Sequence, residues 1–318
     1  MQIEYPDYYE AFHCLAKDCP DTCCKDWEVD VDEDTFYYYR VQEGELGRKL
    51  NRLLKEEGEV KYIPLEENGR CPFLREDKLC EICAALGEEG LSQTCQEYPR
   101  YYMGIGNYEQ IDLSLSCMEV GRLLFTGKEP AHYVKAQDEE EPWETLTPED
   151  QNRLAEILQL RDEMLRALRT LADDHTVKEA CLDEILPDGS RDAELLERIP
   201  RLEILDTEGA ERIGAICRDY AQIAAREKDF RKRYDPLLRP LFAKFASYLV
   251  YRYTIDAFYA GMESVERLRR RSLRLVLLMC IHAEREEGSF DVDTMIRLTH
   301  SFSRQIEHSD ENLECMKL

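Results

Sequence analysis

The distribution of cysteine is the feature that most constrains this chain. Nine of the 13 cysteines lie in the first 117 residues, and only four are spread over the rest of the 318-residue sequence. The nine are Cys14, Cys19, Cys23, Cys24, Cys71, Cys80, Cys83, Cys95 and Cys117. Structural cysteines of a hydrophobic core would be scattered instead. The N-terminal third is therefore predicted to use its sulfur atoms for binding or for chemistry.

The start of the chain indicates the redox environment of these thiols. Residues 1–10 contain no basic segment and no apolar stretch of the kind that directs export. The longest apolar run, residues 275–281, is too short to cross a bilayer. We therefore expect a cytoplasmic protein without a membrane span. Thiols stay reduced there, so the cluster predicts a metal or catalytic site rather than disulfides.

The spacing of the cysteines favours a metal. Cys80-x-x-Cys83, with Cys71 upstream and Cys95 downstream, is typical of thiolate ligand sets, and residues 71–83 are predicted to form a short hairpin. Nine thiols are more than one tetrahedral zinc can use, and an iron–sulfur cluster also accepts four thiolates. Ligand type alone leaves zinc and iron–sulfur both open.

Two helical features are expected near these cysteines. Pro20 suits the first turn of a helix, which would place Cys19 and Cys23 on one face. Residues 32–57 follow a helical pattern, with an acidic start at 32–34. Residues 107–115 alternate as a strand does, and they lead to a helix that begins after Cys117.

The second half of the chain is predicted to be all helical. Residues 138–150 contain seven acidic residues and no basic one, which indicates a linker that ends in a helix start at Thr147-Pro148. Apolar residues then recur at helical spacing in 151–171, 190–205, 207–225, 237–260, 263–287 and 291–308. The predicted architecture is mainly α: a cysteine-rich cluster-binding domain (1–137) with a small β-hairpin or sheet, a linker (138–150) and a helical domain (151–318).

Charge and side-chain clusters limit the function classes. A formal charge of −25 argues against a nucleic-acid binder, because a phosphate backbone needs a basic surface. Five arginines between residues 267 and 274 could hold an anion, although pairing with Glu263 and Glu266 is the simpler explanation. Aromatic residues at 245–259 could stack on a cation, although core packing is the default for such a stretch.

Motifs along the whole chain give the sequence a family resemblance. In the first half they are Asp21-Thr-Cys-Cys-x-x-Trp27, Cys71-Pro-Phe-Leu74, Leu79-Cys-x-Ile82, Thr94-Cys-x-x-Tyr-Pro-Arg100 and Leu113-Ser-Leu-Ser-Cys117. In the second half they are Ser247-Tyr-Leu-Val-Tyr251, Ser303-Arg-Gln-Ile-Glu-His-Ser309 and Glu311-Asn-Leu313. With these residues the chain resembles the flagellin lysine N-methylase family.

The resemblance implies a cytoplasmic enzyme that methylates lysine side chains of flagellin or a similar surface-filament protein. It implies two cofactors, S-adenosylmethionine and an iron–sulfur cluster, for which we expect the four-iron, four-sulfur type. The implied cluster cysteines are Cys14, Cys19, Cys23, Cys24, Cys71, Cys80, Cys95 and Cys117. Cys83 is an extra thiol that the family pattern does not require. The ligand status of Cys83 therefore stays open.

The same motifs supply candidates for the catalytic groups. A lysine amine, with a reference pKa of about 10.4, must lose its proton before it can attack a methyl group. Candidates for the residue that accepts it are Tyr98, Tyr251, Glu307 and His308, and Arg100 and Arg304 are candidates for cofactor binding. The alternative function is a non-enzymatic zinc or iron–sulfur protein whose metal is structural.

Overall fold

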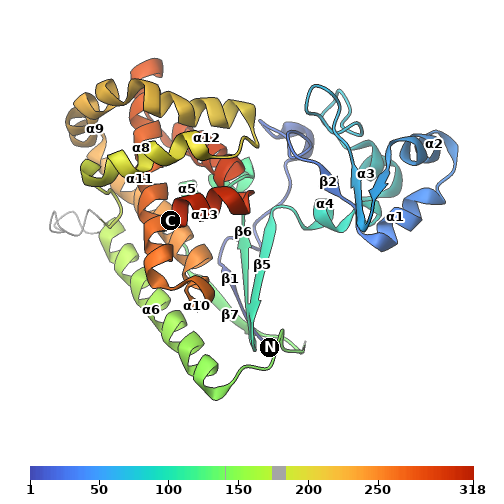
Figure 1. Ribbon diagram of the computed structural model, residues 1–318, viewed down its shortest axis with the longest axis horizontal. Helices are drawn as coiled ribbons and strands as arrows, with labels where there is room; N and C mark the ends of the chain where they lie inside the picture. The colour runs from blue at the N-terminus through green and yellow to red at the C-terminus, as the bar shows by residue number, and fades with distance from the viewer. Residues whose placement is uncertain (140, 174–183) are drawn as a thin grey trace. The chain divides into compact units, whose positions relative to one another are not determined.

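The computed structural model describes residues 1–139, 141–173 and 184–318, so Cys181 lies outside the described residues. It divides the chain into two compact units, a smaller one at residues 13–101 and a larger one at residues 1–12 and 102–318. The fold is mainly helical, and every described strand precedes residue 138, as predicted (Figure 1). The division differs from the predicted one, because residues 1–12 and 102–137 of the predicted cysteine-rich domain belong to the larger unit.

The smaller unit is built on a short antiparallel sheet. Its strands are ordered β2-β4-β3, with β4 (Val60–Ile63) between β2 (Val29–Asp30) and β3 (Lys55–Glu57). Four helices accompany the sheet: α1 (Glu33–Arg40), α2 (Gly44–Leu53), α3 (Glu81–Leu86) and α4 (Gln93–Glu97). Their apolar side chains form a core with Phe36, Leu50 and Phe73 almost completely buried.

The single helix predicted for residues 32–57 is wrong. Asp32 does cap the start of α1, because its carboxylate accepts a hydrogen bond of 2.9 Å from the Thr35 amide. The helix ends at Arg40 and a second one begins at Gly44, whose φ of +75° lies in the left-handed region that favours glycine. The chain then turns into β3 rather than continuing as a helix.

The helical turn predicted for Cys19 and Cys23 is also wrong. The short helical segment is a 3₁₀ turn, Ala16–Asp18, and Cys19 itself is extended, with φ −64° and ψ 131°. A residue that precedes proline avoids the helical region, because the proline ring clashes with its backbone. Pro20 therefore stops the turn that it was expected to start. The hairpin predicted after Cys71 is confirmed by an antiparallel bridge between Leu74 and Cys80.

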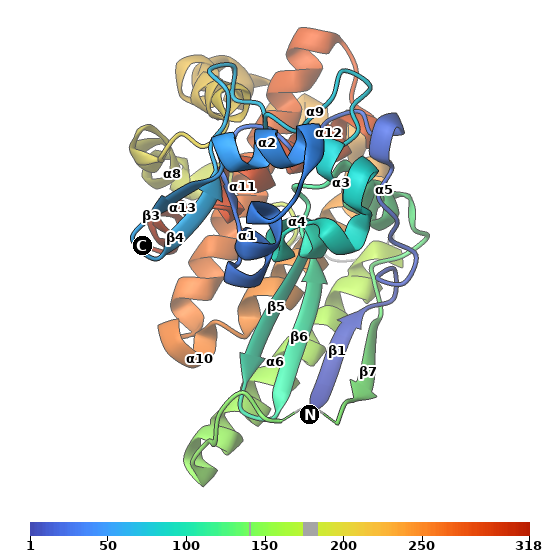
Figure 2. The same cartoon turned by 90° about the vertical axis from the view of Figure 1, so that its right-hand side faces the viewer.

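The larger unit contains a four-stranded mixed sheet in the order β5-β6-β1-β7. Its strands are β1 (Gln2–Pro6), β5 (Arg100–Ile105), β6 (Tyr108–Leu113) and β7 (Tyr133–Gln137). The first strand runs parallel to β6, with Glu4 opposite Gln110, and antiparallel to β7 (Figure 2). The first residues of the chain thus pair with segments more than 100 residues away.

Helices cover this sheet and build the main core. They are α5 (Met118–Thr126), α6 (Pro148–Asp173), α8 (Asp192–Arg198), α9 (Thr207–Thr254), α10 (Ala257–Ala260), α11 (Met262–Glu287), α12 (Val292–Phe302) and α13 (Asp310–Lys317). The predicted start of α6 is confirmed, because the Asp150 amide donates to the Thr147 hydroxyl at 3.2 Å. Within the described residues, no helix is long and apolar enough to cross a membrane.

Helix α9 is the central element of the larger unit. Two helices were predicted here, yet residues 207–254 form one continuous helix that contains Pro236 and Pro240. Every residue from 241 to 255 is buried, so this part of α9 is enclosed on all sides. Both α6 and α11 pack along α9. After α12 the chain forms one turn of π-helix, Ser303–Glu307, which is named η5 and precedes α13.

Candidate functional site

Strand β6 carries polar side chains into the core of the larger unit. Tyr108, Gln110 and Asp112 alternate along the strand and therefore lie on one face of the sheet. Their exposed fractions are 3%, 0% and 1%. Burying polar groups is unfavourable unless each one has a partner, so this face needs an organised set of contacts. Two clusters of side chains supply them.

The first cluster surrounds Glu307, whose side chain is completely buried at the end of η5. The Tyr253 hydroxyl donates to its carboxylate at 2.7 Å, and the Tyr248 hydroxyl donates to it at 2.9 Å. Burial raises the pKa of both tyrosines well above its ordinary value, and in Tyr253 the nearby Glu307 adds to this effect. The two phenols therefore stay protonated and keep donating to the carboxylate.

Arg252 connects Glu307 to Asp112. Its guanidinium lies 3.5 Å from Glu307 Oε1 and 3.4 Å from Asp112 Oδ2. Burial raises the pKa of Asp112 to about 6, although Arg252 and a hydrogen bond from the Leu113 amide act in the opposite direction. We call Asp112, Tyr248, Arg252, Tyr253 and Glu307 the carboxylate–tyrosine cluster. When both carboxylates are ionised, its side chains carry one negative charge in excess.

Two motif segments meet at this cluster. Ser114 and Ser116 follow Asp112, and their hydroxyls lie 2.9 Å apart. The Ser114 hydroxyl also lies 3.2 Å from the Ser303 hydroxyl, at the first residue of η5. A single π-helical turn is rare and frequently occurs at functional sites, because it changes which side chains point inward. Here it places Glu307 against the tyrosines of α9.

The second cluster holds the sheet to α6 and α9. The Arg161 side chain, fully buried on α6, donates to Glu4 at 2.8 Å, to the Tyr108 hydroxyl at 2.7 Å and to Gln110 at 2.8 Å. The Gln110 side chain in turn donates to the carbonyl of Arg252 at 3.2 Å, which links the two clusters. The partners of Arg161 are side chains of strands β1 and β6, so these bonds hold α6 against the sheet. We therefore assign this cluster to the stability of the fold.

The carboxylate–tyrosine cluster is suited to a cation. A buried negative charge attracts a positive group strongly, because little water is present to screen it. Tyrosine rings add a further attraction for an ammonium or sulfonium group. A carboxylate with a pKa of about 6 can also accept a proton near neutral pH. The arrangement therefore places a buried excess of negative charge beside aromatic rings and beside a carboxylate that can accept a proton.

The structure brings some of the predicted site residues together. Glu307 is in the cluster and His308 follows it. Burial and the charge of Arg252 lower the pKa of the His308 imidazole to about 4. Tyr251 is buried next to the cluster, but its hydroxyl donates to the carbonyl of Glu4 at 2.7 Å. Arg304 is 2% exposed and lies within η5. These residues all belong to the larger unit.

The other predicted residues, Tyr98 and Arg100, belong to the smaller unit. The ring of Tyr98 packs against Trp27, with centroids 5.9 Å apart, and the Arg100 side chain donates to the Gln96 carbonyl at 3.4 Å. Sequence reasoning missed Asp112 and Arg252, because an acidic residue in a strand and a basic one in a helix usually face solvent. The only available signal was the position of Asp112 directly before the Leu113-Ser-Leu-Ser-Cys117 motif.

Four predicted metal ligands gather in the smaller unit. Cys24, Cys71, Cys80 and Cys95 all contribute to its apolar core, and the Cys71 amide donates to the Cys24 carbonyl at 2.9 Å. The pKa of the Cys71 and Cys95 thiols is raised to about 12, mainly by burial and in part by the neighbouring Cys24 and Cys80. These four thiols, which we call the thiol group, are therefore close enough to affect each other's charge.

The remaining cysteines are placed differently. Cys14 and Cys23 are exposed, Cys19 and Cys83 are half-buried, and Cys117 belongs to the larger unit. All twelve cysteines in the described part of the chain are free thiols. Within that part, no three or more His, Cys, Asp or Glu side chains are arranged to hold a metal ion. The donor chemistry of the thiol group suits iron or zinc, but its side chains do not surround a common point.

Comparisons with known proteins give one consistent family. A family model described as the FliB lysine N-methylase C-terminal domain matches residues 133–317, which is more than half of the chain. The flagellar biosynthetic protein FliU of Salmonella muenchen is 35% identical over 128 residues, 38% of this chain and 75% of that protein. No solved structure matches.

Two longer relatives are named lysine-N-methylase. They come from Salmonella typhimurium and Salmonella choleraesuis, and each is 35% identical to this chain over 128 residues. The matched segment is 38% of this chain and 31% of each relative. The chain thus spans about a third of the length of these two proteins.

Proposed function

Because the chain belongs to the FliB lysine N-methylase family, we propose that it is a protein-lysine N-methyltransferase that uses S-adenosylmethionine and modifies flagellin or a similar filament protein. The observation that carries the proposal is the family match over residues 133–317. This segment contains the α9 tyrosines and Glu307, which meet in the carboxylate–tyrosine cluster. The cluster is therefore our candidate for the place where the lysine amine reacts.

The proposed role of the cluster is to bind a lysine side chain and accept its proton. Glu307 and the tyrosine rings attract the ammonium group, and the ionised Asp112 takes the proton. With pKa values of about 10.4 for free lysine and about 6 for Asp112, this transfer would cost about 6 kcal/mol. Burial lowers the pKa of the amine and reduces that cost, whereas the charge of Glu307 raises the pKa of the amine and acts against it. The neutral nitrogen can then attack a methyl carbon.

S-adenosylmethionine, when bound, supplies a methyl group on a positively charged sulfur. The new bond joins the lysine nitrogen to the methyl carbon, the carbon–sulfur bond breaks, and its electron pair stays on the sulfur. Arg304 is our candidate for binding the cofactor carboxylate, because it is a buried guanidinium three residues before Glu307. Arg100, in the smaller unit, remains the second candidate.

We further propose that the cysteine-rich segment binds an iron–sulfur cluster. The support is chemical: Cys24, Cys71, Cys80 and Cys95 provide four sulfur donors in one apolar environment. Cys14, Cys19, Cys23 and Cys117 are the other candidates, and zinc is the alternative metal. The optical spectrum and the iron, sulfide and zinc content of anaerobically purified protein distinguish these metals.

The test of the main proposal is direct. Anaerobically purified protein is incubated with flagellin and S-adenosylmethionine, and the mass of each flagellin lysine is measured. We expect methylated lysines with the natural chain and a loss of about 10- to 100-fold with Glu307→Gln, since the variant lacks the charge that attracts the ammonium group and a charge-assisted contact contributes about 1.5–3 kcal/mol. Glu287→Gln serves as the matched control, because this exposed carboxylate pairs with Arg297 on the surface.

The proposal also predicts how the rate depends on pH. Methyl transfer should rise with pH as Asp112 ionises, with an apparent pKa near 6. This part of the profile should be missing in Asp112→Asn. If the natural chain contains its iron–sulfur cluster and still methylates no lysine of flagellin, the proposed function is wrong.

A further inference from the structure

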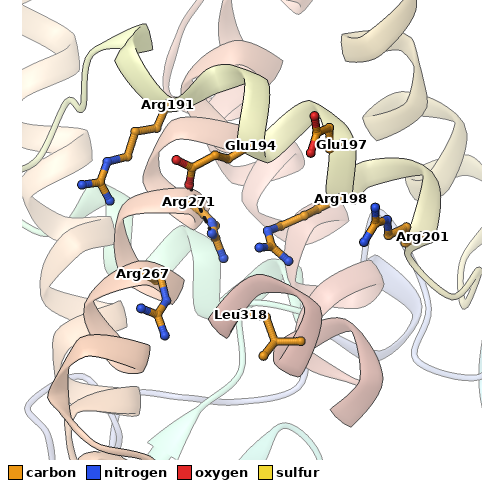
Figure 3. Close-up of a pocket in the computed structure, with 8 residues that line it drawn as sticks. All are labelled: Arg191, Glu194, Glu197, Arg198, Arg201, Arg267, Arg271 and Leu318. Atoms are coloured by element: carbon orange, nitrogen blue, oxygen red, sulfur yellow. Dashed lines mark ion pairs between the residues drawn. The ribbon is translucent and has the colours of Figure 1, made fainter.

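Arginines from two segments of the larger unit surround a pocket of about 410 Å³ (Figure 3). Arg191, Arg198 and Arg201 lie on the short helical stretch that contains α8, and Arg267 and Arg271 lie one turn apart on α11. The other residues of the wall are Glu194, Glu197 and Leu318. We call this site the arginine pocket. Its side chains carry three positive charges in excess, in a protein with a formal charge of −25.

Three of these arginines are fixed by the end of α13. The Arg198 side chain donates to the Cys315 carbonyl at 3.2 Å, Arg271 to Met316 at 2.8 Å and Arg267 to Lys317 at 2.7 Å. The last carbonyls of a helix lack partners within the helix, so these bonds satisfy them. Arg267 also pairs with Glu263 at 2.5 Å, as the sequence predicts. Arg198 and Arg271 each use one of their five N–H groups on the end of α13, so these two guanidinium groups are held in place without being saturated.

Capping of α13 does not account for the other two arginines. Arg191 and Arg201 are exposed, and neither side chain forms a hydrogen bond or ion pair with any residue in the described ranges. The acidic residues of the wall do not balance the charge either. Glu194 reaches Arg271 only at 3.5 Å, the ion pair drawn in Figure 3. The pocket therefore contains positive charge that neither the end of α13 nor the nearby carboxylates neutralise.

Two other arginines of α11, Arg269 and Arg274, are each paired with two carboxylates. Arg269 donates to Glu184 at 2.6 Å and to Glu266 at 2.7 Å, and Arg274 pairs with Asp192 and Glu227 at 2.6 Å. These carboxylates raise the pKa of both arginines. In Arg271 the pKa is lowered by burial, and the nearby Arg198 and Arg267 lower it further. Arg271 is thus set among cations, where an added anion would be stabilised.

We propose that the arginine pocket binds a small anion that carries at least two phosphate groups. An arginine fork matches two oxygens of a phosphate, so five arginines offer more donors than a single phosphate can accept. Phosphate fits better than an apolar ligand, because seven of the eight residues in the wall are charged. The site is independent of the methyl transfer proposed above, since it uses none of the carboxylate–tyrosine cluster.

Binding of inorganic pyrophosphate to the full chain tests the proposal by isothermal titration calorimetry at physiological ionic strength. The pocket variant is Arg191→Gln with Arg201→Gln, chosen because neither side chain supports the fold. We expect saturable binding by the natural chain and a weakening of about tenfold per arginine removed, about 100-fold in total, as for charge-assisted hydrogen bonds. Single phosphate should bind more weakly than pyrophosphate.

The matched control is Arg52→Gln with Arg166→Gln, which removes two exposed arginines that do not line the pocket. It lowers the net charge equally and should bind pyrophosphate as the natural chain does. Circular dichroism establishes that all three proteins are folded. The proposal is overturned if the natural chain shows no saturable binding, or if the pocket variant and the control weaken binding to the same extent.

Discussion

Replacing Asp112 with asparagine removes a carboxylate whose burial opposes folding. Burial raises the pKa of this group to about 6 in the folded protein, and an unperturbed aspartate has a pKa of about 3.9. The difference of about two units, at 1.36 kcal/mol each, means that the ionised group lowers the free energy of unfolding by about 3 kcal/mol. The asparagine amide keeps the oxygen that accepts from the Leu113 amide at 2.8 Å.

The sign of the effect follows from the two pKa values. Below about pH 4 Asp112 is protonated in both states and contributes nothing. Between about pH 4 and pH 6 only the unfolded chain has released the proton, so the stability of the natural protein falls as pH rises. Above about pH 6 the loss is complete. Loss of the Arg252 contact in the variant adds an offset that does not depend on the ionisation of Asp112.

The assay is urea unfolding of both proteins, followed by far-ultraviolet circular dichroism from pH 4 to pH 7. The advantage of Asp112→Asn over the natural chain should grow by about 3 kcal/mol across this range. Asp219→Asn is the control, because hydrogen bonding to His282 and the charge of Arg285 lower the pKa of Asp219. A lowered pKa changes stability only below about pH 4, so this variant should differ from the natural chain by a nearly constant amount between pH 4 and pH 7. A pH-independent difference for Asp112→Asn would refute the reasoning.

Three further substitutions test the remaining assignments. Arg161→Met should destabilise the protein by about 3–5 kcal/mol in urea unfolding, because it leaves Glu4 buried without its partner; adding Glu4→Gln should recover part of that loss. Glu307→Gln should keep most of the free energy of unfolding while its rate of methyl transfer falls. If the variant is instead largely unfolded and its activity falls only for that reason, Glu307 is a structural residue. Cys71→Ser with Cys95→Ser should lower the iron and sulfide content, and Cys217→Ser, outside the predicted ligands, should leave it unchanged.

Local patterns in the sequence were sufficient for most of the helices. The apolar stripe of α6 is buried at Leu154, Ile157, Leu165 and Leu168, as its spacing predicts. The same logic failed at α9, where apolar spacing indicated two helices, at 207–225 and 237–260, and the structure has one that contains Pro236 and Pro240. A proline removes one backbone hydrogen bond, but the burial of residues 241–255 favours continuing the helix. Tertiary packing here outweighs the local tendency of proline to end a helix. Such packing depends on residues far apart in the sequence, so a local pattern cannot predict it.

The candidate site was less accessible to sequence reasoning than the helices. Glu307 and Tyr251 could be named because they lie in motifs, and Tyr248 and Tyr253 because they lie in an aromatic run. Their separate roles could not be assigned, since they depend on the pairing of β1 with β6 and on the π-helical turn. Asp112 gave no signal of its own, because a buried acid in a strand has the same alternation as an exposed one.

Helix α9 joins the stability of the fold to the proposed chemistry. Within two turns it supplies Tyr251 to the carbonyl of Glu4, and Tyr248 and Tyr253 to the Glu307 carboxylate. A movement of α9 that exposed Asp112 to water would lower the cost of burying its charge. The same movement would break the hydrogen bonds from Tyr251 to the sheet. Stabilising substitutions at functional sites commonly reduce activity for this reason. We accordingly expect Asp112→Asn to be the more stable and the less active protein at neutral pH.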